Sequence, residues 1–155
     1  LYQLNKKIFN KLEKRLPEYI FSFPVKKKEI TNAILAEKNN LSKIIKVVHI
    51  EVRKKMHIFL NKHKNKKIVI LDVPLLLENK INKKKDILVF IQAKQSDILR
   101  RLKKRKNFNQ KLLKIFKNIQ YPVKYKMKKS NFIIKNDFTN KTINEGIKNI
   151  LKEIA

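Results

Sequence analysis

The stretch from Ile68 to Glu78, IVILDVPLLLE, limits the fold of this chain more than any other. Apolar and β-favouring residues run without interruption to Asp72 and end at Pro74, a pattern typical of a strand buried on both faces. Strands of that kind form parallel α/β sheets, whose ligands bind beyond the carboxyl ends of the strands. We therefore expect a substrate to lie near Asp72, Pro74 and Glu78.

The remainder of the chain alternates helical and strand patterns. Helices are predicted over residues 1–16 (with Leu4, Ile8, Leu12 and Leu16 on one face), 29–36, 41–60, 96–105, 109–119 and from 142 onward, and further buried strands over 87–91 and 131–134. Asn39, Asn40 or Ser42 is expected to cap the third helix, and Ser96 and Asn109 the next two. This alternation predicts an α/β fold with a parallel sheet, in one domain over residues 1–155.

The composition leaves two interpretations of the charge open. A net charge of +28 favours contact with phosphates, as in nucleic-acid-binding proteins. However, the 40 basic residues are 35 Lys and 5 Arg, accompanied by 17 Asn, which an AT-rich coding sequence would supply without selection for phosphate binding. Arginine is the more informative residue, because its planar fork matches phosphate bidentately.

Cysteine is absent, which excludes disulfides, thiolate metal sites and a cysteine nucleophile, and favours a reducing, cytoplasmic location. No apolar run approaches the length of a membrane span. We expect no membrane partner.

The segment Val73-Pro74-Leu75-Leu76-Leu77-Glu78 after Asp72 resembles the Asp-hydrophobe-Pro-Leu-Leu-Phe-Glu signature of dephospho-CoA kinases, with Leu77 in place of Phe. These P-loop enzymes phosphorylate the ribose 3′-hydroxyl of dephospho-CoA, using ATP and Mg²⁺. The resemblance implies that the substrate is bound by the following residues: Asp72, Pro74, Leu75, Leu76 and Glu78.

A second segment, from Val47 to Arg53, is similar to the Val-His-Pro-x-x-Arg of the same family, with Ile50 in place of Pro. The resemblance implies substrate binding by His49 and Arg53. Spacing of four residues places the two on one helical face. The alternative for His49 is an ordinary helix-surface or partly buried histidine.

The segment Arg101-Leu102-Lys103-Lys104-Arg105 resembles the Arg-Leu-x-x-Arg that opens the lid of P-loop nucleotide kinases. Spacing of four predicts that both guanidinium groups share a helical face and point at one anion. The resemblance implies catalytic roles for Arg101 and Arg105 on the transferring phosphoryl group. The alternative is a solvated basic face.

A fourth similarity covers Gln120-Tyr121-Pro122 and the strand that ends at Asn136. It implies that Asn136 binds the nucleotide, since an amide offers both a donor and an acceptor to an adenine edge. The alternative is an Asn in a turn after a strand.

The phosphate-binding loop of such kinases is missing from the sequence. That loop needs several glycines, whereas Gly146 is the single glycine here and falls inside the last predicted helix. We therefore expect a three-layer P-loop kinase fold with a helical acceptor region and a lid, N-terminally truncated so that the first βα unit is absent. ATP and Mg²⁺ both require that unit, and the chain alone is expected to be inactive.

Two other function classes remain as alternatives. One is a basic RNA-binding module, which would need aromatic residues on an exposed sheet, whereas Phe90 and Phe132 lie in strands predicted to be buried. The other is a P-loop kinase that acts on nucleoside monophosphates. On the leading interpretation the partners are dephospho-CoA and ATP, without specific nucleic acid.

Overall fold

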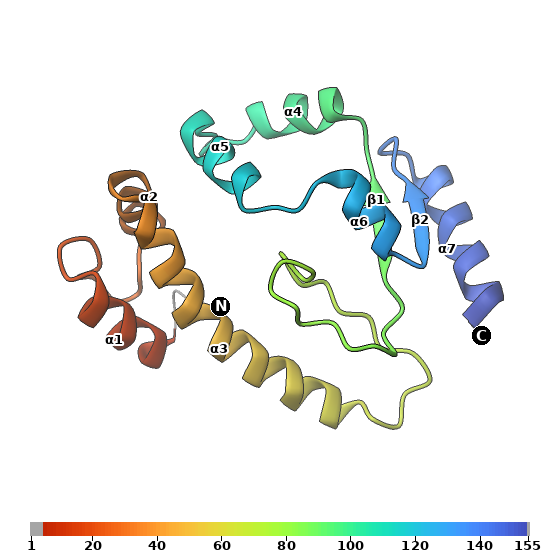
Figure 1. Cartoon of the computed structure of the whole chain (residues 1–155), viewed down its shortest axis with the longest axis horizontal. Coiled ribbons are helices and arrows are strands. Elements are labelled where there is room, and N and C mark those ends of the chain that lie inside the picture. Colours follow the sequence, from red (N-terminus) through yellow and green to blue (C-terminus); the bar gives the residue numbers. More distant parts are fainter. Residues whose placement is uncertain (1–4, 155) are drawn as a thin grey trace. The chain divides into compact units, whose positions relative to one another are not determined.

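The computed structural model describes residues 5–154, which form two compact units that meet in sequence between Val73 and Pro74 (Figure 1). The first unit is helical, and the second contains the sheet. Each is described by itself. The prediction of an α/β chain with a parallel sheet is confirmed.

The first unit consists of three helices around one core. They are α1 (Lys6–Arg15), α2 (Lys27–Ala36) and α3 (Lys38–Lys62), and α1 and α2 both pack on α3. The predicted face of α1 is confirmed at Ile8 and Leu12, which are buried with Leu16, while Leu4 lies outside the described residues. Asn5 caps α1 by accepting the N–H of Ile8 at 3.1 Å.

The loop between α1 and α2 is held by a buried carboxylate. Glu29 of α2 accepts the backbone N–H groups of Phe21 and Ser22 at 3.3 and 3.4 Å, and it also accepts the Ser22 hydroxyl. Ile20 and Val25 anchor the two ends of the loop in the core. The loop is therefore held by contacts on its buried side, although the side chain of Phe21 is exposed.

Helix α3 starts earlier than predicted. It begins at Lys38 after Glu37, so the expected caps Asn39, Asn40 and Ser42 all lie inside the helix, and that prediction is wrong. Asn40 is buried and donates its side-chain N–H to the carbonyl of Ala33 at 3.0 Å. Its side chain thus closes the corner between α2 and α3 instead of capping a helix.

The predicted central strand does not form. Residues 68–73 are extended but unpaired, and Ile70 is 85% exposed. A strand is stable only when a neighbouring strand takes up its backbone N–H and C=O groups, and among the described residues none lies beside this segment. The prediction of burial on both faces is therefore also wrong.

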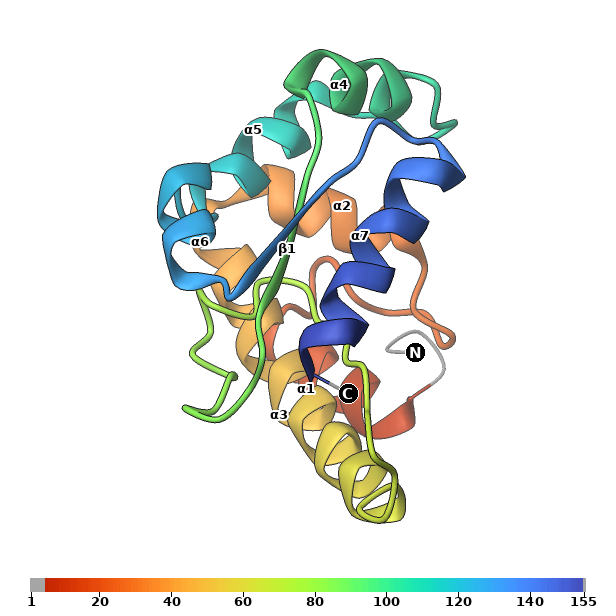
Figure 2. The same cartoon turned by 90° about the vertical axis from the view of Figure 1, so that its right-hand side faces the viewer.

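The second unit contains a parallel pair of strands, β1 (Val89–Gln92) and β2 (Phe132–Lys135), in register from Val89 opposite Phe132 to Gln92 opposite Lys135. Three helices connect them: α4 (Gln95–Lys103), α5 (Gln110–Asn118) and α6 (Val123–Lys129). Helix α7 (Asn140–Ile154) follows β2 and packs on it (Figure 2). Helix α6 was not predicted.

Several details of this unit differ from the predictions. The strands are not buried on both faces: Phe90 and Phe132 are half-buried, and of the two strands' residues only Ile134 is buried, because α7 covers β2 alone. Ser96 does not cap α4, which starts after Lys94, whereas Asn109 caps α5 by accepting the N–H of Leu112 at 2.9 Å.

The single glycine has a packing role. A Cβ atom at Gly146 of α7 would lie 2.9 Å from Cγ2 of Ile134, closer than side-chain atoms approach each other. Glycine therefore lets α7 approach the buried residue of β2. Its position inside a helix was predicted correctly.

Candidate functional site

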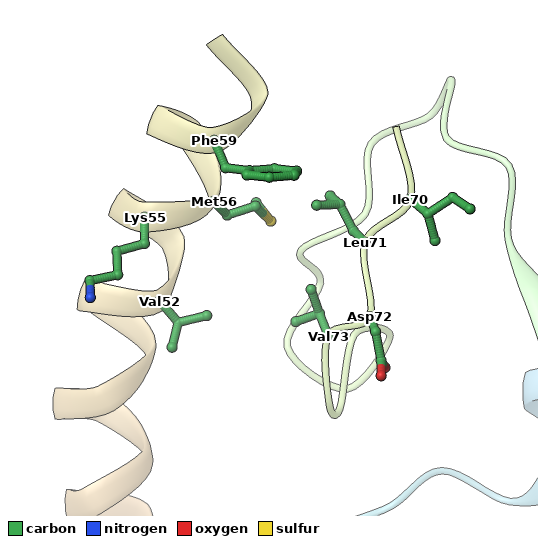
Figure 3. Close-up of a pocket in the computed structure, with 8 residues that line it drawn as sticks. All are labelled: Val52, Lys55, Met56, Phe59, Ile70, Leu71, Asp72 and Val73. Atoms are coloured by element: carbon green, nitrogen blue, oxygen red, sulfur yellow. The ribbon is translucent and has the colours of Figure 1, made fainter. Parts of the chain in front are cut away.

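The first unit has an open pocket of about 330 Å³ between the carboxyl-terminal half of α3 and the extended segment 70–73 (Figure 3). Met56 and Phe59 of α3 point toward Leu71 and Val73, and these side chains make the pocket mainly apolar. The spacing of Val52, Met56 and Phe59 at three and four residues explains why they share one face of the helix.

Asp72 lines the pocket but is directed away from it. Figure 3 shows Leu71 and Val73 turned toward α3, and Ile70 and Asp72 turned the opposite way. Side chains that alternate in this manner are typical of a strand, although no partner strand is present in the described residues. The carboxylate of Asp72 is exposed at the edge of an apolar pocket.

Helix α3 also carries His49 and Arg53, four residues apart as predicted. His49 is half-buried and Arg53 is exposed. Between them, Glu51 is buried and forms ion pairs with Lys11 of α1 at 3.4 Å and with Lys54 at 3.8 Å. This carboxylate ties α1 to α3 and so fixes the rotation of the helix that presents His49 and Arg53.

Pro74 opens a tight turn that extends to Lys80. The N–H of Asn79 donates to the carbonyl of Leu75 at 3.0 Å, and the Asn79 side chain donates to the same oxygen at 2.8 Å. Leu75 has φ of 56°, in the left-handed region that residues other than glycine seldom occupy. Such a conformation costs about 1–3 kcal/mol and persists only where the surroundings impose it.

Glu78, at the end of this turn, contacts the segment before α6. Its carboxylate accepts the backbone N–H of Tyr121 at 2.8 Å and pairs with the ammonium group of Lys126 at 3.0 Å, while the Glu78 side chain is only 9% exposed. Partial burial by itself raises the pKa of Glu78. The hydrogen bonds from Lys126 and Tyr121 outweigh that effect, so the pKa lies below its usual value.

These contacts join two of the four segments that resemble the kinase motifs. One segment ends at Glu78, and the other starts at Gln120. Lys126 also donates to the side-chain oxygen of Gln120 at 3.2 Å. The predicted substrate ligand Glu78 is therefore engaged with groups of the protein. Sequence reasoning missed this contact because the two segments are 43 residues apart.

Arg101 and Arg105 do not share a helical face. Helix α4 ends at Lys103, and Arg105 lies in the following turn, where its carbonyl accepts the N–H of Phe108 at 2.9 Å. The helix predicted to about Arg105 therefore ends two residues earlier, at Lys103, and the predicted shared helical face is not formed.

Arg101 instead lies over an aromatic ring. The central carbon of its guanidinium group is 4.2 Å from the centroid of the Phe138 ring, in the loop between β2 and α7. Helix α4 follows β1 and this loop follows β2, so both residues come after the carboxyl ends of the parallel strands.

Asn136 begins that loop. Its N–H donates to the carbonyl of Gln92 at 2.7 Å, which extends the strand pairing by one residue, and its side-chain oxygen accepts the N–H of Phe138 at 2.7 Å. Asp137 accepts hydrogen bonds from Thr139 and Thr142 at the start of α7, and these bonds lower the pKa of Asp137. The loop that carries Asn136 and Phe138 is therefore well ordered by its own contacts.

Comparison with known proteins decides the family. The family model described as dephospho-CoA kinase matches residues 2–142. The chain belongs to the dephospho-CoA kinase family. Among its relatives are the dephospho-CoA kinase of Wolbachia sp. subsp. Brugia malayi, 30% identical over the whole chain and 80% of the relative, and that of Wolbachia pipientis wMel, 28% identical over 99% of the chain and 80% of the relative. A Bacillus thuringiensis dephospho-CoA kinase is 32% identical over 70% of the chain and 55% of the relative.

The dephospho-CoA kinase family, to which this chain belongs, consists of enzymes. They are nucleotide-binding transferases of coenzyme A biosynthesis. Among the residues that the structure describes, no helix is both long and apolar enough to cross a bilayer. Within the same residues, no group of three His, Asp or Glu side chains is arranged to hold a metal ion.

Phe138 and Tyr121 contact residues that the sequence predicted for the site, but sequence reasoning did not assign a role to either. Phe138 stands two residues after Asn136, at φ of 68°, and the Asn-Asp pair before it is a turn signal that the sequence offers. For Tyr121 no such signal exists, because the structure uses its backbone N–H and not its side chain.

Proposed function

We propose that this chain forms the acceptor-binding and lid regions of a dephospho-CoA kinase, which transfers the γ-phosphoryl group of ATP to the ribose 3′-hydroxyl of dephospho-CoA. The observation that carries the proposal is that Arg101 and the Asn136 loop follow two neighbouring parallel strands at the same end. Ligands of open α/β sheets bind there. Membership of the family supports the reaction.

In this proposal Arg101 and Arg105 act on the phosphates of the nucleotide. Phosphoryl transfer spreads negative charge over the oxygens of the transferred group, and arginine stabilises that charge with paired N–H donors. Because Arg105 lies in a turn beyond α4, it contributes from a separately oriented backbone and not from the helix face of Arg101. The two guanidinium groups are thus proposed to converge only around a bound nucleotide.

Asn136 is proposed to read the adenine. Its side-chain oxygen accepts the N–H of Phe138, which orients the amide nitrogen, and an amide nitrogen is the donor that a ring nitrogen of adenine requires. The neighbouring hydrogen bond from the Asn136 N–H to Gln92 holds the residue at the strand end.

The acceptor, dephospho-CoA, is proposed to bind the first unit. His49 and Arg53 on α3 supply polar and cationic groups, and the apolar pocket beside Met56 and Phe59 supplies a surface for uncharged parts of the acceptor. Asp72 would meet the acceptor from the edge of the pocket. The turn Pro74–Glu78 is proposed to present its substrate contacts through its backbone, since Leu75 is strained and Glu78 is held by Tyr121 and Lys126.

We further propose that a glycine-rich βα unit completes the three-layer sheet and supplies the phosphate cradle. One observation supports it. The side chains of residues 70–73 alternate as in a strand, although no strand among the described residues pairs with this segment. The single glycine, Gly146, serves packing and not phosphate binding.

No step is assigned here to a metal held by this chain alone. Octahedral Mg²⁺ in kinases is held largely by substrate phosphates.

An ADP-release assay with dephospho-CoA tests the proposal on two proteins. One is this chain alone, and the other is this chain fused behind a glycine-rich βα unit taken from a P-loop kinase. We expect turnover from the fusion and none from the chain alone. A matched fusion whose loop glycines are replaced by alanine should be inactive. Turnover by the chain alone, or an inactive but folded fusion, would contradict the proposal.

A further inference from the structure

Phe138 has one ring face covered by the guanidinium group of Arg101, at 4.2 Å, although the residue is 37% exposed. The two residues belong to different elements of the second unit, since Arg101 lies on α4 after β1 and Phe138 lies after β2. The contact therefore bridges the ends of both parallel strands.

The backbone fixes the position of the ring. Phe138 has φ of 68°, and its N–H is held by the side-chain oxygen of Asn136 at 2.7 Å. Asn136 is itself bonded to Gln92 of β1 at 2.7 Å. Arg101, in contrast, reaches the ring with a long and rotatable side chain. In this pair the aromatic ring is the fixed partner, and the guanidinium group is the one that can leave.

The chemistry of the two groups predicts what replaces the contact. An aromatic face attracts a cation or stacks on another flat π system, and nucleobases stack on phenylalanine with little dependence on sequence. A guanidinium group binds phosphate more strongly than a ring face, because it forms paired, charge-assisted hydrogen bonds with phosphate. A nucleotide offers each residue a stronger partner than the other residue does. Its base can stack on Phe138, and its phosphates can bind Arg101.

We propose that Phe138 is a nucleobase-stacking residue whose ring face Arg101 occupies in the absence of nucleotide, and that an adenine nucleotide exchanges this contact. The adenine ring takes the face of Phe138, and Arg101 moves to the phosphates. The inference rests on the proposed function for the identity of the base, because ATP is the nucleotide of that reaction. It adds a binding residue and a ligand-dependent movement of Arg101.

If the exchange occurs, substitutions of Phe138 and Arg101 should have different effects on the affinity for a ligand without phosphate. Adenosine gains the stacking contact but must displace Arg101. Replacing Phe138 by Leu should weaken adenosine binding by about tenfold, the usual effect of losing one stacked base. Replacing Arg101 by Ala removes the competitor, so adenosine should bind at least as tightly as before. ATP should bind the Arg101→Ala variant more weakly, because the phosphate contact is lost.

The experiment is an NMR titration of the full chain with ring-labelled phenylalanine, using adenosine, ATP and inorganic tripolyphosphate as separate probes. Phe138 resonances, assigned by their loss in Phe138→Leu, should shift with adenosine. Phe116→Leu is the matched control, since Phe116 of α5 is 38% exposed, and it should leave adenosine affinity unchanged. Phe138→Tyr keeps the ring and should retain the affinity of the parent chain. Circular dichroism checks that each variant is folded.

Two outcomes would overturn the proposal. One is the absence of any Phe138 shift up to the solubility limit of adenosine. Another is an Arg101→Ala variant that loses as much adenosine affinity as Phe138→Leu does. That result would mean that Arg101 stays on the ring and is not exchanged for the base. None of these measurements depends on transferase activity. A failed ADP-release assay on the fusion together with the expected adenosine results would reject the proposed function and leave the stacking role intact.

Discussion

The carboxylate of Glu78 accepts the backbone N–H of Tyr121 at 2.8 Å, and the same carboxylate pairs with Lys126 one turn into α6 at 3.0 Å. One side chain thereby fixes both the start of α6 and the turn that begins at Pro74. The sequence around Glu78 predicts a role in substrate binding, and in the folded protein its side chain connects two segments. The connection can be tested through its charge.

Glu78→Gln should lower the free energy of unfolding by about 1 kcal/mol at neutral pH, because glutamine keeps an acceptor for the Tyr121 N–H but loses the ion pair with Lys126. The pKa of Glu78 is lowered on folding, so its stabilisation is complete above the unfolded-state value, near 4.5, and is lost as the pH falls through the lower folded-state value. The difference between parent and variant should therefore vanish in acid. Urea denaturation at several pH values measures it.

Glu145→Gln is the matched control for that experiment, because Glu145 is an exposed carboxylate on α7. It should change stability by no more than about 0.5 kcal/mol. An unfolding free energy of Glu78→Gln equal to that of the parent at neutral pH would show that the connection contributes nothing.

Gly146→Ala should destabilise the second unit. The new Cβ atom would lie 2.9 Å from Cγ2 of buried Ile134, and such overpacking costs about 1–3 kcal/mol, partly offset by the gain of about 1 kcal/mol from alanine in a helix. In an Ile134→Ala background the clash is removed, so Gly146→Ala should become neutral or stabilising there. Thermal unfolding of the four proteins of this cycle measures the coupling, and additive effects would disprove the clash.

Arg101→Ala in the fusion protein should reduce kcat by about 10²-fold, with a smaller effect on the KM for dephospho-CoA, because transition-state charge is greater than ground-state charge. Arg105→Lys should recover only part of the rate lost in Arg105→Ala, since lysine does not replace a bidentate contact. Arg100→Ala is the control, because Arg100 pairs with Asp97 at 2.8 Å on the same helix. If the Arg101 and Arg105 variants both had the kcat of the parent, the two arginines would be surface charges without a catalytic role.

Binding of this chain to RNA should be electrostatic and without sequence preference, because the net charge of +28 comes mostly from lysine. Filter binding at rising salt should show affinity falling by about 10³-fold between low and physiological salt if about six phosphates are contacted. Equal affinity for unrelated RNA sequences is part of the expectation. Tight binding of one RNA at physiological salt would favour the RNA-binding alternative.

The helices were predictable because their information is local. Ile8, Leu12 and Leu16 recur at helical spacing and are buried together, and the long pattern over residues 41–60 lies inside α3. Caps were harder to predict. Asn109 caps α5 as expected, but Asn40 has the same side chain and is drawn into the core by the carbonyl of Ala33. Tertiary burial decided which of the two residues became a cap.

The strands and the site depended on contacts that a single segment does not specify. The pattern over residues 68–71 is as apolar as that of β1, yet only β1 found a partner, in β2. Likewise, the family resemblance singled out Arg101 and Asn136, and Asn136 does follow the end of a strand, but Phe138, which contacts both residues, is not part of the quoted motifs. The spacing of Arg101 and Arg105 predicted a shared helical face, and the early end of α4 removed it.

The extended segment 68–73 has a consequence for the protein in solution. An apolar strand with unpaired backbone groups is a template for pairing with other chains, and so for aggregation. Lys66 and Lys67 lie directly before it, and the net charge of +28 makes separate chains repel one another before such segments can meet. Salt that screens this repulsion would turn the most strongly apolar part of the sequence into its point of self-association.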